Sequence, residues 1–224
     1  NLPALETLNA EQVDVMPQET AARQDIRPLR LLLLNLMPKK RDTEIQFARL
    51  FGNTPLQVEM ILMTTASYTP RNTEAGYLRR FYRQLDHVRD DYFDALIVTG
   101  APIETLPFDE VAYWQELTEI MDWSRSHCFR RLGICWGAQA LLWHFFKVPK
   151  HQLEAKLFGV YDHRLAPVSG RLMHGFTDRF PMPISRYTMN RTDDIKTAGL
   201  DVLADGVDCG AGMVRDPKSG DLFV

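Results

Sequence analysis

The chain has 224 residues, of which 45% are hydrophobic and 25% are charged, and its formal net charge is −3. This composition is typical of a folded globular protein and argues against intrinsic disorder. A weakly negative charge provides no general attraction to nucleic acid or to an anionic membrane surface, so neither is expected as a partner.

The cysteine content indicates the redox compartment. The chain has three cysteines, Cys128, Cys135 and Cys209. This number is small and odd, so the cysteines are not expected to form a disulfide framework. Reduced thiols are typical of cytosolic proteins. The N-terminal residues lack the basic and apolar regions of a signal peptide, and apolar runs such as residues 31–34 are too short to span a bilayer. A cytoplasmic protein without membrane association is therefore expected.

Apolar runs and helical periodicity alternate along the first two thirds of the chain. Strands are predicted at residues 29–36, 57–62, 93–98 and 132–134, and helices at 43–51, 74–85, 109–123 and 138–146. Residues 1–26 show no sustained periodicity and are expected to form an irregular arm before one domain of residues 27–224. Beyond residue 150, frequent glycine, proline and aspartate predict loops and short strands beside the main sheet.

The alternation of strand and helix predicts an α/β fold. We expect a single domain with a doubly wound, mostly parallel sheet and helices on both of its faces. Ligands of such sheets bind at the carboxyl ends of the strands. The strand ends at residues 37–41, 99–104 and 135–137 are therefore the expected location of a functional site.

Residues Gly133-Ile134-Cys135-Trp136-Gly137 have the G-x-C-x-G form of a nucleophile elbow between a strand and a helix. Such a turn strains the backbone of the nucleophile, and the positive end of the following helix should lower the pKa of the Cys135 thiol. The backbone N–H of Trp136 is then placed to donate to the oxyanion of an acyl-transfer intermediate. The alternative for a lone cysteine is a buried structural role, which we assign to Cys128 and Cys209.

Other common sites are not indicated by the sequence. No Cys/His pairs occur at zinc-ligand spacing, and the glycine patterns of P-loop and Rossmann proteins are absent. We therefore expect neither a metal nor a bound cofactor.

Two longer segments carry a family resemblance: Leu34-Asn35-Leu36-Met37-Pro38-Lys39-Lys40 and Val98-Thr99-Gly100-Ala101-Pro102. Together with shorter segments up to Ser185-Arg186-Tyr187, they resemble the homoserine O-acyltransferases (homoserine transsuccinylase and transacetylase) of methionine biosynthesis. The resemblance implies a class I glutamine amidotransferase-like, flavodoxin-like fold and a homodimer.

The resemblance also implies roles for residues at matching positions. Cys135 would take the acyl group from acyl-CoA as a thioester, which the hydroxyl of an amino acid then attacks. Lys156 and Ser185 match positions that contact the amino-acid substrate, where a lysine suits a carboxylate. A backbone amide near Lys39 or Lys40 would complete the oxyanion hole, and their side chains, together with that of Arg41, would meet the CoA phosphates.

Glu104 stands where the family decides its acyl donor. A glutamate at this position resembles the members that use acetyl-CoA, because a carboxylate would repel the second carboxylate of a succinyl group. Acetyl-CoA is therefore the expected co-substrate. The alternative is a surface glutamate without a role in specificity.

The general base and the acyl acceptor depend on other parts of the family pattern. The family carries its histidine base in a His-Pro-Glu segment, expected beyond Val224, and none of the six histidines present, His163 included, has the signature of a base. Ile184 and Met189 replace the histidine and the acidic residue that members often carry, so L-serine remains an alternative acceptor to L-homoserine. A class I glutamine amidotransferase, which usually has histidine where Ala138 stands, and a non-catalytic binding homologue are the other hypotheses.

Overall fold

The computed structural model describes residues 3–13, 15–16, 18–21, 23, 25–52, 54, 56–68 and 73–224. Contacts group the chain into two compact units, each built from two stretches of sequence: residues 1–98 with 115–129, and residues 99–114 with 130–224. Among the described residues, no helix is both long enough and apolar enough to cross a membrane.

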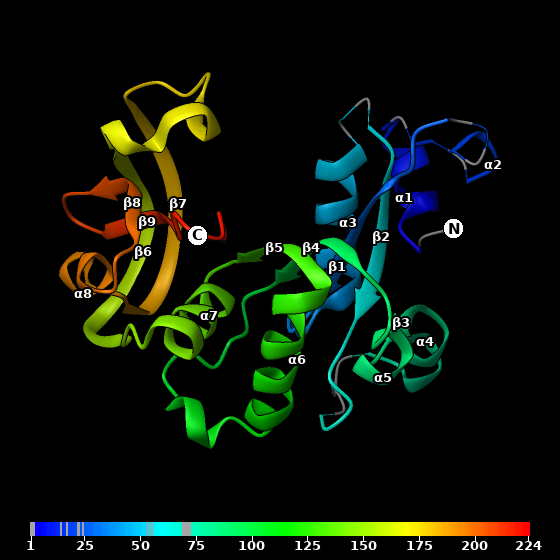
Figure 1. Ribbon diagram of the computed structural model, residues 1–224, viewed down its shortest axis with the longest axis horizontal. Coiled ribbons are helices and arrows are strands. Elements are labelled where there is room, and N and C mark those ends of the chain that lie inside the picture. The colour runs from blue at the N-terminus through cyan, green and yellow to red at the C-terminus, as the bar shows by residue number, and fades with distance from the viewer. Residues whose placement is uncertain are drawn as a thin grey trace. The chain divides into compact units, whose positions relative to one another are not determined.

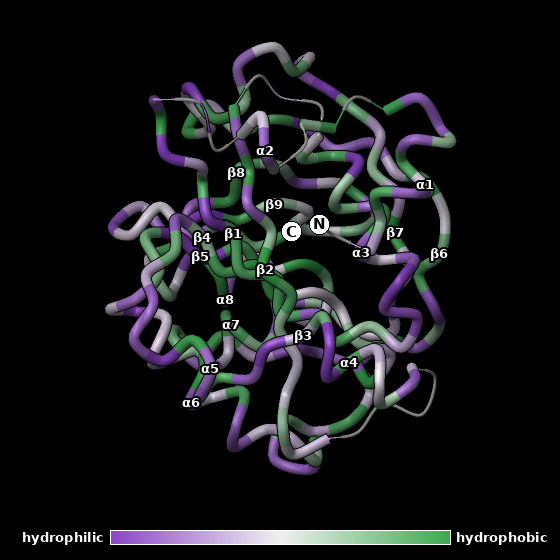
Figure 2. Tube along the Cα trace, turned by 90° about the vertical axis from the view of Figure 1, so that its right-hand side faces the viewer, coloured by the Kyte–Doolittle hydropathy of each residue, from purple (hydrophilic) through white to green (hydrophobic). Residues whose placement is uncertain are grey.

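The first unit is built on a parallel sheet. Its strands follow the order β3-β2-β1-β4 and are β1 (Leu29–Leu34), β2 (Val58–Met63), β3 (Tyr82–Arg83) and β4 (Phe93–Val98). Leu32 lies opposite Ile61 on one side and Leu96 on the other. Leu32, Leu33 and Leu34 are all fully buried, as expected for a parallel strand that is covered on both faces. Figure 2 shows the hydrophobic colouring of β1 and β2.

The helices of the first unit are α1 (Leu5–Ala10), α2 (Gln18–Ala21), α3 (Lys40–Gly52), α4 (Ala75–Phe81), α5 (Leu85–Val88) and most of α6 (Trp114–His127). The expectation of an irregular arm is wrong for residues 5–10. Leu8 of α1 is buried, and Glu11 forms an ion pair with Arg49 of α3, so tertiary contacts order this short helix. The helix predicted at 74–85 is divided into α4 and α5 by the short strand β3. The boundary at residue 26 stays a prediction.

The second unit contains a mixed sheet in the order β5-β10-β9-β8-β6-β7. β5 and β10 pair in parallel, and the other neighbours are antiparallel. These strands are most of β5 (Cys128–Gly133), and β6 (His151–Leu165), β7 (Arg179–Met189), β8 (Asp201–Gly206), β9 (Gly210–Arg215) and β10 (Leu222–Phe223). Its helices are η1 (Phe108–Glu110), α7 (Trp136–Phe146), η2 (Pro167–Met173) and α8 (Thr192–Thr197).

The longest strands follow residue 150, where only loops and short strands were expected. β6 has 15 residues and β7 has 11, and Figure 1 shows them as a long curved pair beside α8. Two features conceal this pair in the sequence. Pro181 and Pro183 lie within β7, where proline argues against a strand. Phe158 and Val160 are exposed, which disrupts the alternation of apolar and polar residues. The prediction of an α/β fold with parallel strands is nevertheless confirmed.

Candidate active site

The turn between β5 and α7 has the geometry of a nucleophile elbow. Cys135 lies at φ 54° and ψ −119°, a positive φ that is rare for a residue other than glycine. The Cys135 N–H donates to the Val224 carbonyl at 2.6 Å, and the Val224 N–H donates to the Gly133 carbonyl at 2.9 Å. The end of β10 therefore holds the strained turn from one side.

Gly133 allows α7 to pack closely against the end of β5. A Cβ atom at this position would lie 2.6 Å from the Cα of Ala138 and 2.9 Å from Cδ1 of Leu141. We expect Gly133→Ala to lower the free energy of unfolding by about 1–3 kcal/mol, because backbone atoms of α7 would have to move. Urea unfolding measures this change. Gly76→Ala in α4 is the matched control, since a Cβ there meets no atom within 4 Å. Equal effects in both variants would contradict this view of the packing.

The pKa of the Cys135 thiol lies above its ordinary value, contrary to the expectation from the helix N-terminus. The residue is open to solvent, but protein atoms surround much of the thiol, and this burial is the largest cause. The backbone N–H of Trp136 and the charge of Arg186 lower the pKa of the thiol, whereas the Glu104 carboxylate raises it. Desolvation thus outweighs the donors at the start of α7, and the thiol needs help to lose its proton.

Two of the three expected strand ends meet at the thiol. A Cβ atom at Gly100 would lie 3.3 Å from Cβ of Cys135 and 3.7 Å from its sulfur, so the Thr99–Pro102 backbone passes directly beside the nucleophile candidate. This arrangement also brings Glu104 into electrostatic range of the thiol. The structure therefore brings Cys135, Trp136 and Glu104 together, as the sequence predicted.

Lys150 is part of this region and was missed by the sequence reasoning. Its Nζ donates to the Glu104 carbonyl at 2.6 Å and also to the Leu106 carbonyl, and it lies 4.5 Å from the centre of the Phe108 ring. Lys150 thereby fixes the loop that carries Glu104. No sequence pattern signals a contact between residues so far apart in the chain.

Lys156 and Ser185 lie on one exposed face of the β6–β7 pair. Ser185 is opposite Phe158 in the register, and Nζ of Lys156 lies 5.5 Å from the Phe158 ring centre and 5.3 Å from that of Tyr187. Successive residues of a strand point to opposite faces. Arg186 therefore lies on the other face, where its charge acts on the Cys135 thiol. Arg186 is a second residue for which the sequence reasoning assigned no role.

His163 is a structural residue in the same unit. It is fully buried, its Nδ1 lies 3.0 Å from the Tyr161 carbonyl oxygen, and its Nε2 lies 3.2 Å from Sγ of Cys209. Cys209 and Cys128 are both buried. Burial agrees with the structural roles expected for the two cysteines, and the contacts of His163 give it a structural role as well.

Lys39 and Lys40 belong to the first unit and differ in exposure. Lys39 is exposed, whereas Lys40 is buried at the start of α3, contrary to the expectation that its side chain meets CoA phosphates. Nζ of Lys40 donates to the Asn35 carbonyl. The Glu44 carboxylate nearby accepts hydrogen bonds from two tyrosine hydroxyls. We call this group the buried polar cluster: Asn35, Lys40, Glu44, Tyr77 and Tyr82.

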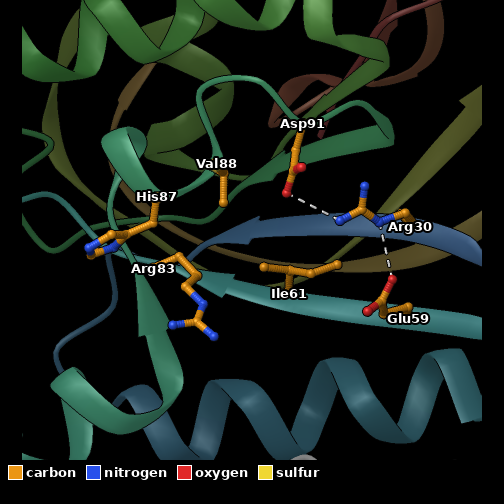
Figure 3. Close-up of a pocket in the computed structure, with 7 residues that line it drawn as sticks. All are labelled: Arg30, Glu59, Ile61, Arg83, His87, Val88 and Asp91. Atoms are coloured by element: carbon orange, nitrogen blue, oxygen red, sulfur yellow. Dashed lines mark hydrogen bonds and ion pairs between the residues drawn. The ribbon is translucent and has the colours of Figure 1, made fainter.

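The first unit also contains a pocket of about 480 Å³ on its sheet. Figure 3 shows Arg30 between Glu59 and Asp91, with which it forms ion pairs at 3.1 and 3.3 Å, and His87 and Arg83 to one side. Its charges largely neutralise one another, and its lining contains no thiol or hydroxyl group. Among the described residues, no group of His, Cys, Asp and Glu side chains could hold a metal ion.

Comparison with known proteins identifies the family. A model of the homoserine O-succinyltransferases matches residues 1–224. The chain belongs to this family. The homoserine O-acetyltransferase of Novosphingobium aromaticivorans is 49% identical over 225 residues, which cover 100% of this chain and 75% of the relative. The homoserine O-acetyltransferase of Cereibacter sphaeroides is 50% identical, with 100% and 73% covered. The chain thus spans about three quarters of these members of the family.

Comparison with solved structures shows the fold of this chain. A putative GMP synthase protein from Thermoplasma acidophilum matches with a TM-score of 0.59 at 16% identity, over 88% of this chain and 82% of that one. A glutamine amidotransferase from Thermotoga maritima matches with a TM-score of 0.59 at 10% identity, over 88% and 74%. At these identities the likeness shows the fold alone. The predicted glutamine amidotransferase-like fold is confirmed.

Proposed function

We propose that this chain is a homoserine O-acetyltransferase that carries the acetyl group on Cys135. The observation on which the proposal rests is the elbow, which presents an exposed thiol on a strained turn at the start of α7. Two relatives at 49% and 50% identity bear the name homoserine O-acetyltransferase, which supports homoserine as the acceptor. A cytoplasmic homodimer without metal or bound cofactor is part of the same proposal.

The reaction has two half-reactions on one thiol. In the first, the Cys135 sulfur attacks the carbonyl carbon of acetyl-CoA, a new C–S bond forms, and the CoA thiolate leaves and takes up the proton given up by Cys135. In the second, the homoserine hydroxyl attacks the carbonyl carbon of acetyl-Cys135. A C–O bond forms, the Cys135 thiolate leaves, and the hydroxyl proton returns to sulfur.

Several groups support these steps. The Trp136 N–H already interacts with the Cys135 sulfur. A donor at this position can also stabilise the oxyanion that forms on the acyl carbon bonded to that sulfur. It stays a prediction that Lys39 belongs to the oxyanion and CoA region. It also stays a prediction that Lys156 and Ser185 contact the amino acid. The histidine base also stays a prediction, and the raised pKa of the thiol is the reason that the reaction needs a base.

The proposal is tested by intact-mass spectrometry of the full chain with acetyl-CoA. We expect a mass gain of one acetyl group, which L-homoserine then removes as O-acetylhomoserine; L-serine is the second acceptor to try. Ammonia release from glutamine without any acetyl transfer would instead favour an amidotransferase. A chain that neither takes up acetyl nor releases ammonia would favour a binding homologue.

Glu104→Gln is expected to change the acyl donor preference. Removing the carboxylate beside the thiol removes about 1–2 kcal/mol of repulsion toward a succinyl carboxylate. The ratio of kcat/KM for succinyl-CoA to that for acetyl-CoA should therefore rise about tenfold. Glu110→Gln, at an exposed position of η1, is the matched control and should leave the ratio unchanged. An unchanged ratio in Glu104→Gln would remove Glu104 from the specificity site.

A further inference from the structure

The β6–β7 pair presents its cations on two different faces. Lys156 stays with Phe158 and Tyr187 on the exposed face that also carries Ser185. Arg186 follows Ser185 directly and points to the other face, where its charge acts on the Cys135 thiol. Of these two cations, Arg186 is the one that this unit directs toward the nucleophile candidate.

The guanidinium of Arg186 has unused capacity for an anion. Its Nη2 donates to the Cys209 carbonyl, while its buried Nε has no hydrogen-bond partner among the described residues. The acidic groups that act on it within the same part of the chain are the thiols of Cys209 and Cys135, and no carboxylate pairs with it there. A partly buried cation without a counter-ion is costly, so an anionic ligand would be favoured at this position.

The surroundings of Arg186 fix its position. The Cys209 carbonyl that accepts from Nη2 lies in the turn between β8 and β9, and the Cys209 thiol contacts buried His163. Gly206 and Gly212 leave the space that Cys209 and the His163 ring occupy, because a Cβ atom at either glycine would collide with them. The guanidinium is thus held in place before any ligand binds, which lowers the entropic cost of binding.

We propose that Arg186 binds the α-carboxylate of the amino-acid acceptor and so directs the acceptor hydroxyl to acetylated Cys135. This inference rests on the proposed function. A guanidinium matches a carboxylate through two parallel N–H donors, a geometry that a lysine ammonium cannot reproduce. The hydroxyl of a short amino acid held in this way would lie close to the thioester.

The test separates the two half-reactions in the full chain. Acetyl-Cys135 is discharged either by L-homoserine or by aminopropanol, which is homoserine without its carboxyl group. We expect Arg186→Gln to slow discharge by homoserine about 10- to 100-fold, mainly through KM, because a hydrogen bond to a charged group is lost. Discharge by aminopropanol should change less than about twofold. Acetylation by acetyl-CoA should slow less than discharge by homoserine does, because the Arg186 charge is only one of the groups that lower the pKa of the thiol. Arg186→Lys should fall between wild type and Arg186→Gln, and Arg179→Gln, on the same strand, should match the wild type.

Two results would overturn the proposal. Equal slowing of discharge by both acceptors would point to a general effect on the thioester, and slowing of acetylation alone would point to a role in binding CoA. Calorimetric titration of homoserine into Cys135→Ala chains, with and without Arg186→Gln, gives an answer that does not depend on acetylation. If wild type takes up no acetyl group, the proposed function fails. If Arg186→Gln does not weaken the binding of homoserine, the Arg186 proposal is overturned separately. Circular dichroism confirms that each variant is folded.

Discussion

Cys135→Ala is expected to abolish the acetyl mass gain and to lower acetyl transfer at least about 1,000-fold. Without the sulfur no thioester forms, and the two-step route through a covalent intermediate is closed. The remaining donors, including the Trp136 N–H, would retain only the small acceleration that binding and oxyanion stabilisation give without a nucleophile. Steady-state kinetics with acetyl-CoA and homoserine, together with intact mass, measure both effects.

Cys128→Ala is the control for this prediction. Cys128 is buried in β5 and lacks the elbow geometry, so its removal should leave the acetyl mass gain in place. Acetylation of Cys135→Ala to the wild-type level would show that another residue carries the acetyl group. Loss of acetylation only in Cys128→Ala would move the nucleophile to the other end of the same strand.

The local part of the candidate site could be predicted because it is encoded in contiguous residues. The glycines around Cys135 and the strand before it specify the turn, and the structure gives Cys135 the strained backbone that this pattern predicts. The approach of Gly100 to the thiol follows from the rule that parallel strands end at the same edge. The predicted direction of the shift in the thiol pKa was wrong, because burial of the thiol raises the pKa and depends on residues that lie far away in the sequence.

The parts that could not be predicted depend on pairing between distant segments. Arg186 reaches the thiol environment only because β7 pairs with β6 in a particular register, and the alternation along β7 sends Ser185 and Arg186 to opposite faces. A shift of one residue would exchange the two. Lys40 shows the same limit. Its side chain was expected to meet the CoA phosphates, yet it is buried by contacts with Asn35 and Tyr82.

The buried polar cluster predicts an unusual dependence of stability on pH. Burial lowers the pKa of Lys40 from 10.5 to about 8, and the charge of Glu44 only partly opposes this effect. The unfolded chain therefore binds more protons than the native chain between pH 8 and 10.5, so the contribution of Lys40 to stability rises with pH in this range. The full difference corresponds to about 3 kcal/mol, of which about 2 kcal/mol should be gained between about pH 7 and 9.5.

Urea unfolding of wild type and Lys40→Met at several pH values measures this gain as the difference between the two chains. The difference is needed because burial raises the pKa of the thiols of Cys135 and Cys209, which makes their contributions fall as pH rises. The pKa values of Tyr77 and Tyr82 are also raised, so their contributions to stability fall above about pH 10, as those of the thiols do. The measurement therefore stops at about pH 9.5. Lys196→Met, at an exposed position of α8, should keep the wild-type slope. If Lys40→Met keeps that slope as well, the Lys40 ammonium is hydrated in the native chain and the cluster is open to water.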